Sequence, residues 1–473
     1  MATNTAGTAS TGTKVRMTHA PIVSPADTPN FLDNEFVPSK ATHWIPVYDP
    51  ATNNLVTRVP QSTAEELSMA ENWDRLAASI TLEQGKTFND ARGDVLRGLQ
   101  VAETACGITT QLPGEVLEVA RDMETRSYRE PLGVVAAICP FNFPAMIPLW
   151  CIPIAVVTGN TLILKPSERD PGAALILAEL AREAGLPNGV LNIVHGAVDT
   201  VNFIIDEPAI RAISFVGSNR AGEYIYSRGS ANGKRVQANL GAKNHAVLLP
   251  DADKETALNA IAGAAFGAAG QRSLVEKARK LVVSAGFEKD ADVGPVISPE
   301  SRRRIESLIA RAEREGASIL LDGRGCKPEK YPQGNFVAPT VITNVNTNMA
   351  CYKEEIFGPV LVCISVQTLE EAVGLLNANE YGNGASIFTK SGSSASYFQK
   401  NIEAGQVGIN VAIPVPLPMF SFTGNKKSIA GGGANTFYGK PGLAFYTQQK
   451  TVTSLWRREN VHSGKQVVMP SHL

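Results

Sequence analysis

The sequence predicts an α/β protein organised around a doubly wound parallel sheet. Between residues 131 and 227, short apolar runs rich in β-branched residues alternate with stretches of helical periodicity, which is the pattern of βαβ units. A second region of alternating strand and helix signals follows from about Leu240. The chain has 473 residues, enough for two or more domains with substantial cores. We therefore expect two α/β regions, each with its own sheet.

The elements that precede this alternation are of mixed type. Residues 31–60 combine short strand-like pairs with Pro and Asn turns, which predicts a β-rich lead-in. Helical periodicity predicts helices over Glu65–Gln84 and Val95–Ile108. Residues 112–128 predict an extended hairpin of mixed polarity.

The alternating regions supply the strands and helices of the two sheets. The first is expected to contain strands Val134–Ile138, Thr161–Leu164, Val190–Val194 and Ile210–Phe215, with helices Gly172–Glu183 and Ala221–Ser227. The second predicts strands near Lys280–Ser284, Ser318–Leu321, Val360–Val366, Ala385–Phe388 and Gly408–Asn410, and strand-like alternation returns over Leu443–Trp456. No G-x-G-x-x-G motif follows any of these strands, so an ordinary Rossmann phosphate loop is not expected.

The composition excludes several classes of function. Lys plus Arg number 44 and Asp plus Glu 45, and basic residues do not cluster with aromatic ones, so no nucleic-acid partner is expected. The six cysteines, at positions 106, 139, 151, 326, 351 and 363, show no CxxC spacing, as expected of a reducing compartment. The most apolar stretch, Met146–Thr158, is short and interrupted by prolines, which predicts buried core and no membrane span.

The two ends of the chain carry only weak targeting signals. Residues 1–26 contain no acidic residue, several Thr and Ala, and the two fixed positive charges Lys14 and Arg16. A mitochondrial presequence and a disordered tail both fit that composition. The final tripeptide, Ser471–Leu473, resembles a peroxisomal signal too loosely to favour that compartment.

Polar residues gather where two of the predicted strands end. Asn142 lies on a proline-bounded turn just after the first strand, and Lys165 and Glu168 come directly after the second. Open α/β sheets bind ligands at the carboxyl ends of their strands. An amide, a cation and a carboxylate are therefore expected at one ligand site. A buried βαβ unit with polar residues only in its turns would have the same composition.

The order of the short motifs resembles one enzyme family. PFNFP at 140–144 and KPSE at 165–168 are followed, in order, by SFVGS, NLGAKNH, GQR, EEIFGPV and PLPMFSFTGNKKS. Across residues 31–456 the chain resembles the aldehyde dehydrogenase superfamily, and within it the acylating, coenzyme A-dependent branch that oxidises methylmalonate and malonate semialdehydes. The resemblance implies a tail over 1–26, an NAD-binding domain over 27–239, a catalytic domain over 240–430, and an oligomerisation element formed by the 112–128 hairpin and residues 431–473.

The resemblance implies NAD as the cofactor. A carboxylate at Glu168, beside Lys165, can accept both hydroxyls of a ribose and repels a 2′-phosphate, which favours NAD over NADP. Ser218 follows a strand and opens a helix, so its hydroxyl and the helix amino end can meet a pyrophosphate; a simple N-cap has the same signature. Other cofactor positions of the family match Cys139, Phe141, Arg169, Leu240 and Glu355.

Two asparagines match the chemistry of the acylating branch. Asn142 matches the family's oxyanion amide, an uncharged donor for the oxygen of a tetrahedral thiohemiacetal. Asn239 stands where hydrolytic members carry a glutamate base. An amide cannot accept a proton at neutral pH, so the coenzyme A thiol is expected to deacylate the enzyme in place of water. Arg97 and Arg272 match the arginines that hold the substrate carboxylate, although an arginine in a helix is usually solvent-facing.

The chain departs from the family pattern at two places. The family reads Gly-Gln-Arg-Cys at its nucleophile, whereas here Ser273 follows Arg272. Ser273 fits the N-cap of a helix over Leu274–Lys280, and we interpret it as a junction across a missing strand and helix of ~17 residues. Residues 68–70 form a second junction, where the family has a longer helical pair.

Three functions remain for comparison. The first is an acylating dehydrogenase that yields propionyl-CoA or acetyl-CoA with decarboxylation, as in valine breakdown, impaired here because its nucleophile is missing. The second is a non-catalytic NAD-binding subunit or a truncated splice or gene-model form. The third, a hydrolytic aldehyde dehydrogenase, conflicts with Asn239. The resemblance further implies coenzyme A as co-substrate, a homo-oligomer of two or four subunits, and the mitochondrial matrix, with the cytoplasm as the alternative.

Overall fold

The structure is a computed structural model in which two compact units are distinguished, Met1–Asp74 and Arg75–Leu473. It describes residues 27, 30–32, 35–37, 44–48, 55–60, 71–265, 275–276, 278–412, 414–430 and 437–456. In the first unit, two antiparallel pairs confirm the β-rich lead-in: β1 (Asn30–Leu32) with β2 (Glu35–Val37), and β3 (Trp44–Tyr48) with β4 (Leu55–Pro60).

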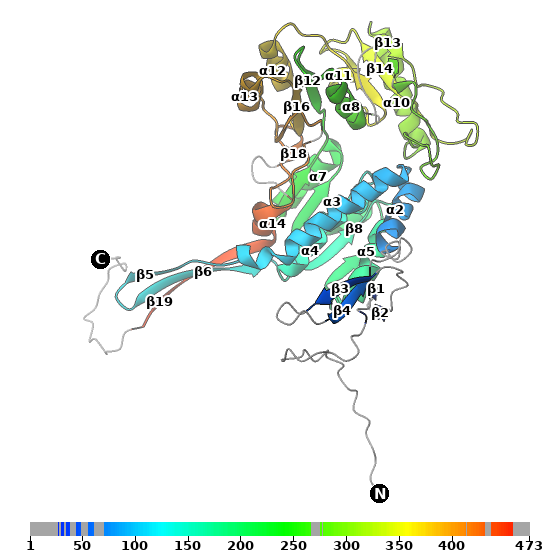
Figure 1. Cartoon of the computed structure of the whole chain (residues 1–473). Helices are drawn as coiled ribbons and strands as arrows, with labels where there is room; N and C mark the ends of the chain where they lie inside the picture. The colour runs from blue at the N-terminus through cyan, green and yellow to red at the C-terminus, as the bar shows by residue number, and fades with distance from the viewer. Residues whose placement is uncertain are drawn as a thin grey trace. The chain divides into compact units, whose positions relative to one another are not determined.

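A six-stranded sheet forms the core of the second unit and confirms the predicted doubly wound architecture (Figure 1). Its strands are β7 (Val134–Ile138), β8 (Thr161–Lys165), β9 (Leu191–Ile193), β10 (Ile210–Val216), β11 (Arg235–Asn239) and the antiparallel edge strand β18 (Ile429–Ala430). They lie in the order β18-β11-β10-β7-β8-β9, and the five strands β7 to β11 run parallel to one another. The chain order reverses between β7 and β10, which is where such sheets bind dinucleotides.

Helices cover both faces of this sheet. One face packs against α3 (Phe88–Cys106), α4 (Met146–Val157), α5 (Gly172–Glu183) and α14 (Gly439–Tyr446), and the other against α6 (Val198–Asp206) and α7 (Asn219–Ala231). In β7, Val135 and Ala137 enter the first core, while Ala136 and Ile138 enter the second. Because strand side chains alternate between faces, a continuous apolar run is what a strand buried on both sides requires.

A hairpin of two helices holds the amino ends of two others. It consists of α2 (Glu71–Gln84) and α3, and the described part of α2 begins six residues after the predicted start at Glu65. Glu83 Oε2 accepts a hydrogen bond from the backbone N–H of Gly172, at the start of α5 (2.9 Å). Asp94 Oδ1 accepts one from the backbone N–H of Met146, at the start of α4 (2.8 Å). Each carboxylate therefore satisfies an N–H group that a helix leaves unpaired.

A three-stranded antiparallel sheet contains the predicted hairpin. It follows the short 3-10 helix Ile108–Gln111 and is built from β5 (Val116–Ala120), β6 (Met123–Pro131) and β19 (Thr447–Leu455), which lie side by side in Figure 1. The prediction of strand-like structure over Leu443–Trp456 was wrong at its start, because α14 runs to Tyr446. Leu443 and Tyr446 are three residues apart and both enter the core against α4, which favours a helix there.

The second α/β region contains two three-stranded sheets. In one, β12 (His245–Leu248), β16 (Gly384–Phe388) and β17 (Gln406–Ile409) are parallel. In the other, β14 (Thr340–Thr343) pairs with β13 (Ser318–Leu321) and β15 (Val360–Val362). Its helices are α8 (Lys254–Ala265), α10 (Pro299–Arg314), α11 (Ala350–Lys353), α12 (Leu369–Ala378) and α13 (Gly392–Asn401). The boundary predicted between residues 239 and 240 stays a prediction.

One predicted strand of this region, Lys280–Ser284, does not form. Residues 282–284 make only an isolated bridge, between Val283 and Val293. The backbone N–H groups of Asp292 and Val293 both donate to the carbonyl of Val282, and the Asp292 carboxylate accepts from the N–H of Val282. The segment thus satisfies its backbone groups by folding back on itself. The strand expected over Val360–Val366 likewise ends at Val362.

Among the described residues, no helix combines the length and the apolar character that crossing a membrane requires. The residues 61–70, which contain one predicted junction, lie outside the described part of the chain, as do both termini.

The loop between α2 and α3 lies in close backbone contact with residues 286–295. The backbone N–H of Phe88 donates to the carbonyl of Gly286 (3.0 Å). A Cβ on Gly294 would lie 2.0 Å from the carbonyl oxygen of Gly85, and one on Gly286 would lie 2.1 Å from that of Lys86. Only glycine permits these approaches, so the loop that leads into α3 joins the first sheet to the second α/β region.

We expect Gly294→Ala to destabilise the protein by roughly 1–3 kcal/mol, because the clash is with backbone and cannot be relieved by a rotamer change. Gly374→Ala is the matched control: it lies in α12 with nothing within 4 Å of its Cβ position, and should stabilise by roughly 0.5–1 kcal/mol. Chemical denaturation of both variants measures the difference, and equal midpoints would contradict the role of this contact.

Candidate functional site

The carboxyl ends of β7 and β8 are joined at the centre of the candidate site. The backbone N–H of Cys139 donates to the carbonyl of Lys165 (2.9 Å). Cys139 is buried, and burial raises the pKa of its thiol well above the usual value. The thiol is therefore protonated at neutral pH and is not an activated nucleophile.

Asn142 is half-buried on the turn that follows β7, and its Oδ1 is buried without a hydrogen-bond partner among the described residues. The turn is held from α3. Lys86 Nζ lies 2.9 Å from Asp94 Oδ2 and 3.9 Å from the centre of the Phe143 ring, while the other Asp94 oxygen binds the start of α4. The amide of Asn142 is thus presented from a fixed turn with capacity for a further partner.

Lys165 and Glu168 lie together at the end of β8, as predicted. Lys165 is buried, and its Nζ donates to the carbonyl of Pro166 (2.9 Å) and to Glu168 Oε2 (3.3 Å). Partial burial acts to raise the pKa of Glu168, but its own backbone N–H and the Lys165 charge outweigh it and hold the pKa below the usual value. An exposed, ionised carboxylate is available there, beside the exposed Arg169.

Ser218 is the N-cap of α7, directly after β10, and its side chain makes no capping hydrogen bond. The simple N-cap interpretation of the sequence therefore does not describe this hydroxyl. Gly217 precedes it, and a Cβ at that position would lie 2.5 Å from the Phe215 ring. An exposed hydroxyl and the amino end of a 13-residue helix stand together at the reversal of strand order, an arrangement suited to an anion.

Glu355 reaches the same region from the second α/β region. Its Oε1 accepts a hydrogen bond from the backbone N–H of Ala242 (3.1 Å), and burial raises its pKa. The buried Leu240 lies two residues earlier and donates its N–H to the carbonyl of Ser428 (2.8 Å). A Cβ on Gly241 would lie 3.0 Å from Glu355 Oε2, so the chain passes close to this carboxyl group.

Two aromatic rings bring these parts together. Phe141, from the Asn142 turn, meets Phe357 edge to face with ring centres 5.6 Å apart. Phe357 has a positive φ of 59°, a conformation that a bulky residue adopts only when its surroundings impose it. Sequence reasoning missed Phe357, although it lies within the EEIFGPV motif; no local signal indicates a positive φ there.

Asn239 ends β11 and is buried, and its carbonyl accepts from the N–H of Gly217 (3.1 Å). Arg97 lies on an exposed part of α3, where its charge acts to lower the pKa values of Asp94 and Tyr438 against the effect of burial. The predicted residues Arg272 and Ser273 lie outside the described residues. The described part of the chain contains no cluster of His, Cys, Asp or Glu suited to a metal ion.

Together these residues provide the groups that a dinucleotide needs. An ionised carboxylate at the end of β8 suits ribose hydroxyls, an exposed hydroxyl at a helix amino end suits a pyrophosphate, and a second carboxyl group is bound to the segment that follows β11. The sequence predicted each of these positions separately, and the structure brings them to one edge of the sheet.

The chain is similar to known proteins over most of its length. The model of the aldehyde dehydrogenase family matches residues 66–274 and 272–452. The methylmalonate-semialdehyde/malonate-semialdehyde dehydrogenases, acylating and mitochondrial, of Mus musculus and Homo sapiens are 52% and 51% identical to this chain. Each alignment spans 492 positions and covers 93% of this chain and 92% of the relative.

Solved structures give the same result. A protein from Sinorhizobium meliloti, described as a methylmalonate-semialdehyde dehydrogenase and crystallised with NAD, has a TM-score of 0.80 and 36% identity, covering 93% of this chain and all of its own. The methylmalonate-semialdehyde dehydrogenase of Oceanimonas doudoroffii has a TM-score of 0.77 and 37% identity, with the same coverage.

Asp170, which follows Arg169, is a buried carboxyl group beside the site. Neither of its oxygens has a hydrogen-bond partner among the described residues. Burial raises its pKa to about 8; the nearby Ser167 hydroxyl offsets this only in part, and the Glu83 charge adds to it. The folded protein therefore keeps a proton that the unfolded chain loses above a pH of about 4.

We expect the destabilising effect of Asp170 on the folded protein to increase with pH. Between pH ~4 and ~8 the unfolded chain binds fewer protons at this group, so stability falls as pH rises, with a slope approaching about 1.4 kcal/mol per pH unit. Asp170→Asn removes this titration. The unfolding free energy of the variant should match the parent near pH 4 and exceed it increasingly up to pH 8. A pH-independent difference would show that Asp170 is ionised in the folded state.

Proposed function

The chain belongs to the aldehyde dehydrogenase family, and from this premise we propose that its site is that of an NAD-dependent, acylating dehydrogenase of methylmalonate and malonate semialdehyde. The observation that carries the proposal is Asn239, a buried amide at the end of β11 in place of a base. The acylating enzymes named above share about half of its sequence over nine-tenths of its length.

The cofactor interactions are proposed for the groups at the strand ends. Bound NAD supplies the hydride acceptor. Glu168, held by Lys165, accepts the hydroxyls of the adenine ribose, and Ser218 with the amino end of α7 donates to the pyrophosphate. Phe141, Arg169, Cys139 and the backbone near Leu240 would line the cofactor. Glu355 accepts the hydroxyls of the nicotinamide ribose.

Two side-chain amides are proposed to determine how the oxyanion is stabilised and which molecule accepts the acyl group. Asn142 donates its amide N–H to the oxygen that becomes negatively charged when a thiolate adds to the aldehyde, and its rigid turn lowers the cost of that orientation. Asn239 does not activate water, because an amide has no basic site at neutral pH. The thiol of coenzyme A ionises far more readily than water and takes the acyl group. With decarboxylation, the products are propionyl-CoA from methylmalonate semialdehyde and acetyl-CoA from malonate semialdehyde.

Substrate binding is proposed for two arginines. Arg97 is exposed on α3, and its charge acts on the buried Tyr438. A guanidinium fork suits a carboxylate, so Arg97 and Arg272 together would hold the acid end of the semialdehyde.

We propose that this chain lacks the nucleophile because a segment is missing after Arg272. Two observations support a deletion. The family model matches in two pieces that meet at residues 272–274, where the family cysteine is expected. The alignments span 492 positions, more than the 473 residues of the chain, so the relatives carry segments without a counterpart here. The junction at 68–70 is the second place proposed for such a loss.

The proposed activity is therefore impaired in this chain, and a non-catalytic NAD-binding subunit is the alternative. Losing a strand also exposes sheet edges and apolar side chains, which lowers solubility. Leu248 in β12 and Leu320 in β13 are 41% and 45% exposed, as expected of sheets that lack a neighbour.

Assembly and compartment are proposed from the same comparisons. The sheet of β5, β6 and β19 exposes Val116, Leu117 and Leu455, which supports its role as the oligomerisation element of a dimer or tetramer. Because close relatives are named mitochondrial, the mitochondrial matrix is the proposed location.

We expect this chain to bind NAD much more tightly than NADP, since Glu168 repels a 2′-phosphate. Glu168→Gln removes the charge but keeps an acceptor, so the ratio of the two dissociation constants should shrink by roughly tenfold or more. Glu179→Gln, a distant exposed carboxylate paired with Arg75, is the matched control. Equal affinity of the parent for both cofactors in equilibrium titration would refute the assignment of Glu168.

We expect no measurable NADH production from methylmalonate semialdehyde and coenzyme A by this chain. A serine hydroxyl lacks the thiolate fraction of cysteine, and burial keeps the Cys139 thiol protonated. Insertion of the family segment that begins with Gly-Gln-Arg-Cys should restore turnover that depends on coenzyme A. Turnover by the parent chain near that of an intact relative would contradict the deletion, and release of free acid without coenzyme A would contradict the role of Asn239.

A further inference from the structure

We propose that Arg304 and Lys243 are positioning residues that hold Glu355 for the nicotinamide half of the cofactor. The inference rests on the proposed function, because it concerns the same cofactor site. It adds two residues that have no assigned role in cofactor binding or catalysis and that reach the Glu355 turn from two different elements.

Arg304 binds the turn from α10. Its Nη2 donates to the carbonyl of Glu355 (2.7 Å), and its Nη1 donates to the carbonyl of Ile356 (2.9 Å). The guanidinium also lies 3.7 Å from a carboxylate oxygen of Glu354. A planar fork that grips two successive carbonyls fixes the peptide between them, and therefore fixes the direction in which the Glu355 side chain leaves the backbone.

Lys243 binds the turn from the loop between β11 and β12. Its Nζ donates to the carbonyl of Cys351 (2.8 Å), within the short helix α11, and to that of Glu354 (2.7 Å), the residue after this helix. The preceding residue, Ala242, donates its N–H to the Glu355 carboxyl group itself. Burial lowers the pKa of Lys243 to about 8, so these two carbonyl bonds offset the cost of burying its charge.

These bonds act on a strained part of the chain. Phe357 has a positive φ of 59°, and Gly358 lies so close to α10 that a Cβ would be 2.5 Å from the Ile305 side chain. Without restraint the segment would relax toward an ordinary conformation, because such a φ costs free energy in a bulky residue. The carbonyls held by Arg304 and Lys243 all belong to the residues that lead into this point, the last of them to Ile356, directly before Phe357.

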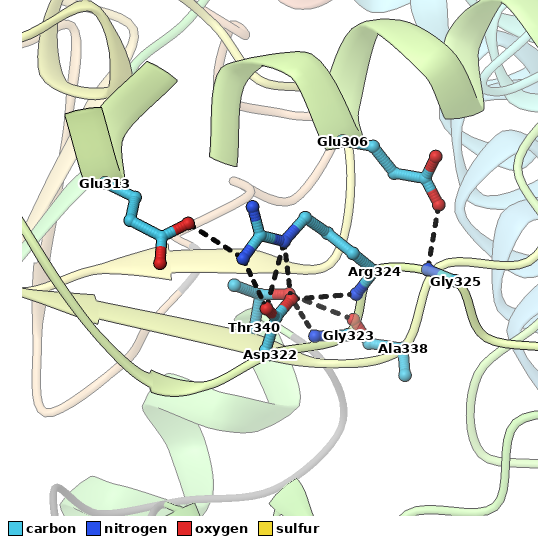
Figure 2. Close-up of polar contacts among 8 residues, drawn as sticks. All are labelled: Glu306, Glu313, Asp322, Gly323, Arg324, Gly325, Ala338 and Thr340. Atoms are coloured by element: carbon cyan, nitrogen blue, oxygen red, sulfur yellow. Dashed lines mark hydrogen bonds and ion pairs between the residues drawn. The ribbon is translucent and has the colours of Figure 1, made fainter. Parts of the chain in front are cut away.

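Helix α10 is itself held in place by the loop after β13, so Arg304 binds the Glu355 turn from a fixed position. Figure 2 shows Arg324, in the loop after β13, donating to Asp322 and to Glu313 of α10, the latter at 3.0 Å. In the same view the N–H of Gly325 donates to Glu306 of α10 (3.0 Å). The loop therefore binds α10 at two positions seven residues apart, Glu306 and Glu313, both of which follow Arg304 in the helix.

The test compares the dissociation constants of NAD and AMP for the full chain. AMP carries only the adenosine half, which Glu168 and Ser218 would bind. Arg304→Gln and Lys243→Met should weaken NAD binding by roughly tenfold, as expected for loss of charge-assisted hydrogen bonds, and leave AMP binding within about twofold. Arg303→Gln is the matched control, because Arg303 directly precedes Arg304 in α10 and pairs only with the exposed Glu300 among the described residues.

A double-mutant comparison separates positioning from general loosening of the fold. If Arg304 acts through Glu355, Arg304→Gln should change NAD affinity by less than about twofold in a Glu355→Gln background. Arg304→Lys, which can keep at most part of the fork, should give an intermediate loss. An unchanged tenfold effect in the Glu355→Gln background, or equal losses of NAD and AMP affinity, would overturn the inference.

Binding of NAD and AMP to the parent chain distinguishes an error in the proposed cofactor site from an error in the role of Arg304 and Lys243. If the parent chain binds neither NAD nor AMP, the proposed cofactor site is wrong and the inference falls with it. If AMP and NAD bind the parent with the same affinity, the adenosine site stands but Glu355 contributes nothing, and only the inference is overturned. If Lys243→Met does not fold, Arg304→Gln and Arg304→Lys alone decide the outcome.

Discussion

The amino ends of α4 and α5 are held by two carboxylates from a single helical hairpin, and the candidate site depends on this arrangement. Asp94 binds the start of α4 and Glu83 the start of α5. The Asn142 turn precedes the first helix, and the Lys165–Glu168 segment precedes the second. Lys86 balances the charge of Asp94 and lies over Phe143. Because burying a carboxylate without its partner costs free energy, loss of Lys86 or of the start of α4 as a partner would destabilise the other interactions of Asp94.

The same hairpin connects the two α/β regions. Its loop approaches residues 286–295 through glycines, with no room for side chains. The edge-to-face contact of Phe141 with Phe357 makes a second connection. The two carboxyl groups of the candidate site have different environments. Glu168 is exposed and ionised, whereas burial raises the pKa of Glu355.

In the proposed function, the residues that would bind the cofactor are distinct from the group that would attack the aldehyde. Each described residue proposed to bind the cofactor has a defined place, from the end of β8 to the turn at Glu355. The group expected to attack the aldehyde is the one that the sequence lacks. Neither Cys139 nor Cys151 replaces it, because both are buried and burial raises the pKa of both thiols. The architecture that binds NAD does not require the nucleophile, so its loss need not disturb the first sheet.

The sequence by itself determined the parallel sheet, the residues at its strand ends and the family. Apolar runs of the right length and β-branched content define β7 and α5 to the residue, because buried strands and amphipathic helices differ in period. Only the tertiary structure decided which ends meet. Asp94 caps α4 and Arg304 binds the carbonyl of Glu355, and both contacts join residues far apart in the chain. The positive φ of Phe357 is likewise imposed by its surroundings and not by its local sequence. The segment Lys280–Ser284 has the composition of a strand, but its backbone groups pair locally through Asp292. The hydrophobic periodicity of a segment indicates which of its faces are buried. Contacts between distant segments depend on how the whole chain folds, which no local sequence pattern specifies.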